Sequence, residues 1–297
     1  MVLSRRRVLA RTALPAQPAA RGTAMNDRSP PPSAAVGGAV DEMIEPEVGE
    51  RFGWLAGLLA AGPGDRVVDL GCGRGALLAA VAAARPDRAG ELIGLDASAE
   101  LLRETARRLD GAAPWLVQAN LAGALPLAAG SVDRVLCHNV LECLPDPGAL
   151  VAEAWRILRP GGRLVLSHSD FDTLVFHSED LALTRRLVRA YCDAQQDWMD
   201  AVDGTIGRRL ADLVSHSLFQ VVDVQAQAWL GRAFRPGELG YGYAHNLAAT
   251  LRDAGLAEAA ELDGWLAGLQ RLEDRGGFLF SLNDYAVVAV RPGRPDP

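Results

Sequence analysis

The chain has 297 residues, of which 49% are hydrophobic and 23% charged, proportions that fit one large globular domain or one domain with a lid. Residues 1–40 hold six arginines and one acid, a charge of +5, so the formal net charge of −7 for the whole chain leaves −12 on residues 41–297. Such an acidic domain argues against nucleic-acid binding. All 30 basic residues are arginines, and the lack of lysine excludes Schiff-base chemistry and a P-loop.

The first 40 residues are rich in alanine, arginine and proline and show no hydrophobic periodicity. This composition predicts a disordered or non-native tail, with Met25 as a candidate start of the chain. No run of residues reaches the roughly 18 apolar positions of a membrane span, and the four cysteines form no CxxC pair, which indicates reduced thiols. We therefore expect a cytoplasmic protein that does not enter a membrane.

From residue 41 onward, predicted strands and helices alternate. Helices are expected at residues 47–61, 76–85, 98–111 and 146–158, with Ser98 and Asp146 as caps. Strands are expected at residues 66–70, 91–95, 115–118, 134–137 and 163–167. This alternation predicts βαβ units and an α/β fold with a doubly wound parallel sheet, so ligands should bind beyond the carboxyl ends of the strands.

The stretch VVDLGCGRGALL follows this pattern from strand to helix. Gly71 and Gly73 allow a backbone to approach a ligand closely, and Gly75 allows the helix to begin close to the strand. Asp69 offers a carboxylate to a cationic or amino group, and Asp96, at the end of the next strand, can accept both hydroxyls of a ribose. The spacing GxGxG differs from the dinucleotide pattern GxGxxG, so a nucleoside without pyrophosphate fits better than NAD.

This stretch resembles the first motif of class I S-adenosylmethionine-dependent methyltransferases. Further segments that resemble the family are residues 119–126, 131–135, 138–147 and 158–162. The resemblance covers roughly residues 47–293 and is greatest to the ubiquinone/menaquinone-biosynthesis type, which acts on small molecules. It implies a Rossmann-like, seven-stranded mixed sheet, with residues 219–229 as the sixth strand and residues 278–290 as an antiparallel last strand.

The resemblance also implies S-adenosylmethionine as the cofactor. The cofactor-binding residues that it implies are Asp69, Gly71, Cys72, Gly73, Gly75, Asp96, Ala97, Asn120, Leu121 and His138. Asn120 stands where the family normally has an acid, although its amide can still bind an adenine edge. Cys137, His138 and Cys143 match no usual zinc spacing, so we expect no metal.

Methyl transfer from a sulfonium is an in-line displacement, so the protein must align the reacting atoms and exclude water. A hydroxyl or acidic-carbon acceptor also needs a general base, for which histidine is the likeliest side chain near neutral pH. The candidates are His168, His138 and His177. We favour His168, because it ends the fifth strand where the methyl group is expected.

The segments that vary within the family should surround the acceptor. We expect residues 41–297 to form one methyltransferase domain with helical lid segments near 171–215 and 236–275, the second holding helices at 247–254 and 262–272. Asp170 and Asp172 either cap the helix that follows or attract an amine. The residues expected near the acceptor are Tyr241, Tyr243, Gln227, Trp229, Ser281 and Asn283.

The favoured function is methyl transfer to O, N or C of a small molecule, in bacterial secondary metabolism. The alternatives are an NAD-dependent oxidoreductase and an S-adenosylmethionine-binding protein that does not methylate. The sequence leaves the oligomeric state open between monomer and homodimer.

Overall fold

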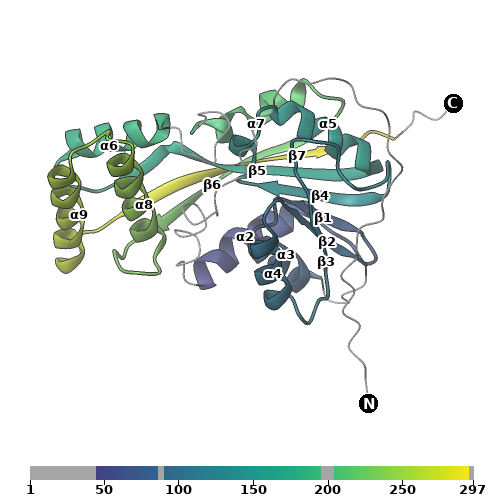
Figure 1. Cartoon of the computed structure of the whole chain (residues 1–297), viewed down its shortest axis with the longest axis horizontal. Helices are drawn as coiled ribbons and strands as arrows, with labels where there is room; N and C mark the ends of the chain where they lie inside the picture. The colour runs from purple at the N-terminus through teal and green to yellow at the C-terminus, as the bar shows by residue number, and fades with distance from the viewer. Residues whose placement is uncertain (1–44, 86–89, 195–203, 294–297) are drawn as a thin grey trace, which may run out of the picture.

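The computed structural model describes residues 45–85, 90–194 and 204–293 (Figure 1). Seven strands form one sheet in the order β3-β2-β1-β4-β5-β7-β6. They are β1 (Val67–Leu70), β2 (Leu92–Asp96), β3 (Trp115–Gln118), β4 (Val132–His138), β5 (Leu158–Phe176), β6 (Gln220–Gly231) and β7 (Phe280–Val290). β1 to β5 pair in parallel, and β7 runs antiparallel between β5 and β6. The predicted doubly wound, seven-stranded mixed sheet is confirmed, whereas the predicted tail lies outside the described residues.

Most helices with predicted bounds lie close to their predicted positions, but the helix predicted to begin at residue 247 begins at Leu239. The helices are α2 (Glu45–Leu59), α3 (Ala76–Ala84), α4 (Ala99–Arg108), the 3-10 turn η1 (Leu141–Cys143), α5 (Pro147–Ile157), α6 (Leu181–Asp193), α7 (Ile206–Ser215), α8 (Leu239–Asp253) and α9 (Ala259–Asp274). Ser98 accepts the Leu101 N–H at the start of α4, and Asp146 accepts the Ala149 N–H at the start of α5, so both predicted caps are present. No helix within the described ranges is long and apolar enough to cross a membrane.

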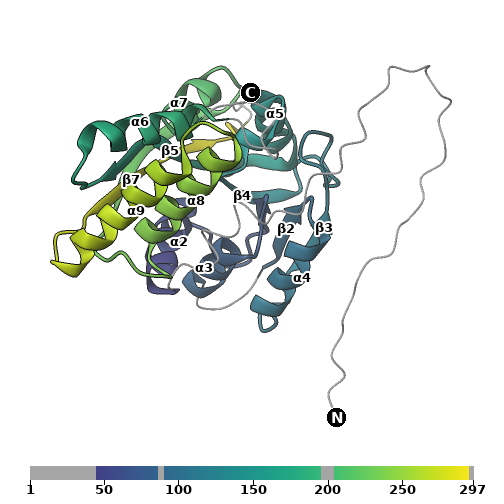
Figure 2. The same cartoon turned by 60° about the vertical axis from the view of Figure 1, so that its left-hand side comes forward.

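The two faces of the sheet bury separate sets of side chains. On one face Val67, Leu136 and Val165 pack with α2, α3, α8 and α9, which lie on the same side of the sheet (Figure 2). Val68, Val135 and Leu164 point to the other face and pack with α5 and α7. This alternation follows from the two-residue period of a strand, which sends successive side chains to opposite faces.

β5 is much longer than the sequence predicts. It continues past Ser167 to Phe176 because β7 offers partners there, with Asp170 opposite Asn283 and, after a register shift between Asp170 and Val175, Phe176 opposite Phe280. Residues 171–176 are therefore strand rather than the beginning of a helical lid. Asp170 and Asp172 do not cap α6, the helix that follows, which Asp180 caps; they form ion pairs with Arg208 of α7, whose backbone N–H also donates to Asp170 at 3.3 Å.

The long ends of β5, β6 and β7 carry a group of helices at one end of the molecule (Figure 1). We call this group the arm: α6, α8, α9 and the strand ends 169–176, 227–231 and 280–285. α7, which lies inside the predicted lid segment 171–215, does not belong to it, because α7 packs on the sheet against β5 and β7. The arm lies beyond the carboxyl end of β4 and so borders the edge where a ligand is expected.

Candidate active site

The glycine loop after β1 contains three glycines in the left-handed backbone region, with φ of 76° at Gly71, 51° at Gly73 and 78° at Gly75. A Cβ on Gly75 would lie 2.5 Å from Thr105, so this glycine permits close packing against α4, whereas the sequence predicts close packing against the strand. A Cβ on Gly73 would meet nothing within 4 Å, so its side faces open space. Gly71 differs from the prediction, because Val140 occupies the space that its missing side chain leaves, at 2.3 Å from an added Cβ.

Asp69 is a buried carboxyl group with one oxygen that no described residue binds. Its exposed fraction is 2%, and its Oδ2 atom has no hydrogen bond. Burial, assisted by the nearby charge of Asp96, raises its pKa to about 8. A buried carboxylate is stabilised when a cation pairs with it, so Asp69 fits a ligand that carries an ammonium group.

The other predicted cofactor-binding residues follow the carboxyl ends of neighbouring strands. Asp96, at the end of β2, accepts N–H groups from Gly73 at 2.9 Å and from Ser98 at 2.8 Å. Asn120, which follows β3, is exposed and accepts the Ala122 N–H at 2.9 Å. The remaining residues of the predicted set near these strand ends are buried Cys72, exposed Ala97 and buried Leu121. The parallel order β3-β2-β1-β4 therefore brings the predicted set to one edge of the sheet.

His138, the last residue of β4, lies beside this set. Its ring meets the ring of Phe52 edge-on, with centroids 5.6 Å apart, and its buried Nδ1 atom has no hydrogen-bond partner. Burial and the neighbouring Arg51 charge lower its pKa to about 3. His138 is therefore neutral near pH 7 and a weak base.

His168 lies on β5 but faces the α5 and α7 side of the sheet. It has no exposed surface, its Nε2 atom contacts the Glu142 carboxylate, and its Nδ1 atom lies 2.6 Å from the Ser169 carbonyl oxygen. Both partners only accept hydrogen bonds, so both ring nitrogens carry protons. Burial opposes this charge, but Glu142 outweighs it and raises the pKa of His168. The prediction that His168 acts as the base does not fit this geometry, because the imidazole already holds its proton and is sealed from the site.

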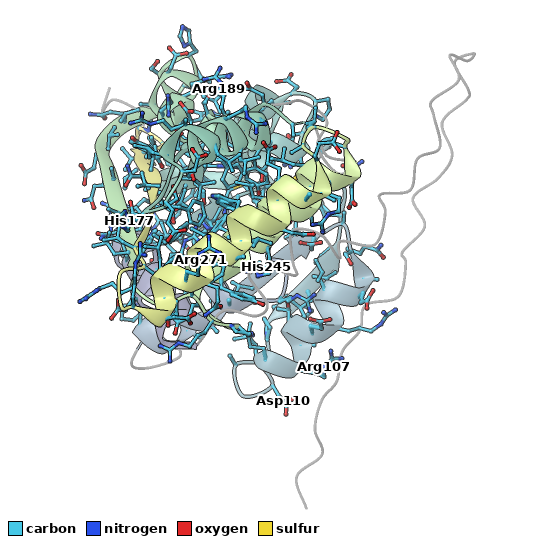
Figure 3. All side chains as sticks on the ribbon, turned by 90° about the vertical axis from the view of Figure 1, so that its left-hand side faces the viewer. Arg107, Asp110, His177, Arg189, His245 and Arg271 are labelled. Carbon is cyan, nitrogen blue, oxygen red and sulfur yellow. The ribbon has the colours of Figure 1, made fainter. Side chains whose placement is uncertain are left out.

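His177 lies far from the predicted cofactor site. It follows β5 at the outer end of the arm, is exposed, and donates its backbone N–H to the Leu279 carbonyl at 2.9 Å (Figure 3). Nine residues of extended chain separate it from His168, a distance on the order of 25 Å. The structure thus does not bring the three candidate histidines together.

A buried ion pair that the sequence analysis missed lies beside His138. Arg51 of α2 donates from Nε and Nη2 to the Asp284 carboxylate of β7, at 2.5 and 2.7 Å. Ser169 accepts from Arg51 at 2.7 Å and donates to Asp284 at 2.8 Å, and Trp229 donates its indole N–H to Asp284 at 2.9 Å. Asn139, the residue after β4, donates to Ser169 at 3.1 Å, so the network joins α2, β5, β6, β7 and the loop that follows β4.

The expected acceptor-side residues are only partly in this network. Trp229 belongs to it, but Asp284 rather than its neighbour Asn283 faces α2, because neighbouring strand residues point to opposite faces. Tyr243 also belongs to the network, because its hydroxyl hydrogen-bonds with Arg51 and Ser169, and its buried ring stacks on Phe280 with centroids 5.7 Å apart. Tyr241 instead lies against His245, which Figure 3 labels on α8, at 4.1 Å between ring centroids. Among the described residues, no group of three or more acidic, histidine or cysteine side chains is placed to hold a metal.

Comparisons with known proteins give the class of this chain. The methyltransferase domain family matches residues 68–166. A trans-aconitate 2-methyltransferase of Methylobacterium radiotolerans is 30% identical over 235 residues, which cover 77% of this chain and 80% of that protein. An uncharacterized 37.1 kDa protein in transposon TN4556 of Streptomyces fradiae is 33% identical over 231 residues, covering 78% of this chain and 64% of that protein. A solved structure from Bacillus halodurans has the same fold, with a TM-score of 0.54, 17% identity, and coverage of 82% of this chain and 99% of the other.

The chain therefore belongs to the S-adenosylmethionine-dependent methyltransferases. Its cofactor is S-adenosylmethionine, and relatives of this kind methylate small molecules. The orphaned Asp69 oxygen and the open side of Gly73 fit this cofactor, because they provide a carboxylate and a space at the expected strand end.

Proposed function

We propose that this chain transfers the methyl group of S-adenosylmethionine to a small molecule held between the glycine loop and the arm. The observation that carries this proposal is the buried Asp69 Oδ2 atom, which no described residue binds, in the same loop as the open side of Gly73. When bound, the cofactor supplies an electrophilic methyl group on a sulfonium. The residues of the chain bind it, orient the acceptor and exclude water.

Each predicted cofactor contact has a distinct task in this proposal. Asp69 would pair with the ammonium group of the methionine part, and Asp96 would accept the ribose hydroxyls. Asn120 and Leu121 would border the adenine. Both carboxylate oxygens of Asp96 accept backbone N–H groups in this structure. To bind the ribose hydroxyls, Asp96 would therefore give up its hydrogen bond from the Gly73 N–H.

The acceptor that best suits this site needs no general base. His168 already carries its proton, His138 has a pKa of about 3, and His177 lies at the far end of the arm. A carboxylate attacks through an oxygen that has lost its proton below neutral pH, whereas an alcohol must lose a proton in the reaction. We therefore favour carboxylate acceptors over alcohols. The neutral His138 would then orient the acceptor by a hydrogen bond.

The arm would cover the acceptor and select it. Its strand ends carry Asp284 and Trp229, which belong to the network beside His138, and this placement supports the assignment. A role in bacterial secondary metabolism and a cytoplasmic location remain part of the proposal, the latter supported by four cysteines that form no disulfide. The NAD-dependent oxidoreductase is not favoured.

The test combines binding and turnover. Calorimetry should show binding of S-adenosylhomocysteine but not of NAD, and Asp69→Asn should weaken that binding. Methyl transfer from labelled S-adenosylmethionine should then be measured against a panel of small carboxylic acids and their matched alcohols. Binding without turnover on any member of the panel would favour the non-methylating alternative, and turnover on the alcohols alone would reject the carboxylate acceptor.

A further inference from the structure

β6 is the outer strand of the sheet and has one neighbour, β7. Within the described part of the chain, its second edge pairs with no strand, so its outward N–H and C=O groups are available. β6 is also long, since it extends over Gln220–Gly231 along the border of the arm (Figure 1).

Edge strands are usually protected from pairing by charges, prolines or bulges. β6 has such features only near its beginning, where Asp223 follows an irregular register at Val221. Residues 224–230, VQAQAWL, contain no charge, proline or glycine. Val222, Val224 and Leu230 are 46%, 51% and 67% exposed, so this edge also presents apolar side chains to its surroundings.

The same segment is complementary to itself when it is paired antiparallel about Gln227. In that register Val224 lies opposite the partner's Leu230, and Ala226 lies opposite the partner's Ala228. The exposed face thus pairs large with large and small with small, and the other face pairs Gln225 with the partner's Trp229. A twofold axis at Gln227 relates the two strands, so each of these residue pairs occurs twice in the dimer, as an isologous interface requires.

We propose that β6 pairs with β6 of a second copy of this chain, antiparallel and centred on Gln227, and joins the two sheets into one. A single strand pairing buries less surface than a standard interface, so the dimer should dissociate in the micromolar range. The cofactor site lies beyond the carboxyl ends of β1 and β2, on the other half of the sheet, so each copy keeps its own site.

Sedimentation of the full chain over a range of micromolar concentrations should show a monomer–dimer equilibrium. Val224→Lys should shift it to monomer because it replaces the apolar contact with the partner's Leu230 by a charged side chain, while S-adenosylhomocysteine affinity stays unchanged and so reports correct folding. Leu218→Lys, on a residue that is 70% exposed just before β6, is the matched control and should leave the equilibrium unaltered.

Oxidative crosslinking tests the register. In the proposed dimer the two copies of residue 227 face each other at about 4.5–5.5 Å between Cα atoms, within disulfide range, whereas the two copies of residue 222 lie roughly 30 Å apart. Gln227→Cys should therefore crosslink rapidly, and Val222→Cys should behave as the unsubstituted chain. The proposal is overturned if the chain is a monomer at every concentration, or if both cysteine variants crosslink equally. It is also overturned if dimers form only after residues 1–40 are removed, because residues 1–40 of the same chain would then be the segment that covers the β6 edge.

Discussion

Arg51 of α2 and Asp284 of β7 lie 233 positions apart in the sequence and are joined by two hydrogen bonds, of 2.5 and 2.7 Å. Neither side chain is more than 2% exposed. Burial opposes the charge on Asp284, but Arg51 outweighs it and lowers the pKa of the carboxyl group. Since α2 packs beside the cofactor half and β7 extends into the arm, this pair fixes the arm to the rest of the domain.

Removal of one member of this pair should destabilise the fold strongly. Asp284→Leu or Arg51→Met alone leaves a buried charge without its partner, and we expect the free energy of unfolding to fall by about 3–5 kcal/mol. The double variant Arg51→Met with Asp284→Leu should lose much less than the two single losses together, because no charge is left unpaired. Urea unfolding measures all four forms, and strictly additive losses would contradict a coupled pair.

Cofactor affinity should depend on pH through Asp69. Its pKa of about 8 means that a cationic ligand must displace a proton from it at lower pH. We expect S-adenosylhomocysteine affinity to rise from pH 6 to pH 8, by at most about tenfold per pH unit, and to stay low and flat in Asp69→Asn. Calorimetry in two buffers with different ionisation heats should detect proton release for the unsubstituted chain only; equal proton release in the variant would place the titrating group elsewhere.

Asp69 should also lower stability in the absence of cofactor. The unfolded aspartate loses its proton near pH 4, whereas the folded one keeps it to about pH 8, so the free energy of unfolding falls as pH rises between these values. Asp69→Asn removes this cost, and we expect its melting temperature at pH 8 to exceed that of the unsubstituted chain. The gain should shrink toward pH 4, and a gain independent of pH would indicate another cause.

Gly71 and Gly73 of the glycine loop should respond differently to substitution. Gly71→Ala places a methyl group against Val140 and should reduce the free energy of unfolding by about 2–4 kcal/mol, part of which Val140→Ala restores. Gly73→Ala faces open space, so only its left-handed backbone costs stability, about 1 kcal/mol. Its main effect should be weaker binding of S-adenosylhomocysteine. Thermal melting and calorimetry of both variants separate the effects, and the idea fails if Gly73→Ala alters stability alone.

His168 should support the fold rather than take a proton from the acceptor. Its pKa is raised in the folded state, so the stability it contributes is fully present below its ordinary value of about 6.5 and is lost as pH rises through the higher, folded pKa. We expect His168→Gln and Glu142→Gln to lower the free energy of unfolding more at pH 6 than at high pH. Turnover of His168→Gln should be reduced by one constant factor across pH, while a defect that disappears at high pH would restore the role of base.

Local patterns were enough to predict most of the fold and the cofactor edge. Helix caps such as Ser98 and the glycine spacing after β1 depend on nearby residues, so the sequence displays them directly. The continuation of β5 depends on a distant partner, β7, and the polar run from Ser167 to Asp172 resembles a helix start when it is considered alone. Arg51 is one charged residue in an amphipathic helix, and Glu142 is one acid in a short turn. Nothing near either residue in the sequence reveals its buried partner, so both were missed.

The continuous course of β5 from Leu158 to Phe176 has a consequence for how acceptor preference can change. The same strand is a core element of the cofactor half at its beginning and a support for the helices of the arm at its end. If the arm covers the acceptor as proposed, insertions, deletions and exchanges in α6, α8 or α9 should alter what faces the acceptor without moving the register of β1, β4 or the glycine loop. A family built on this plan can diversify at one end of its sheet while the other end stays constant, and chimaeras that exchange residues 177–193 and 232–279 between relatives would be the natural way to transfer acceptor choice.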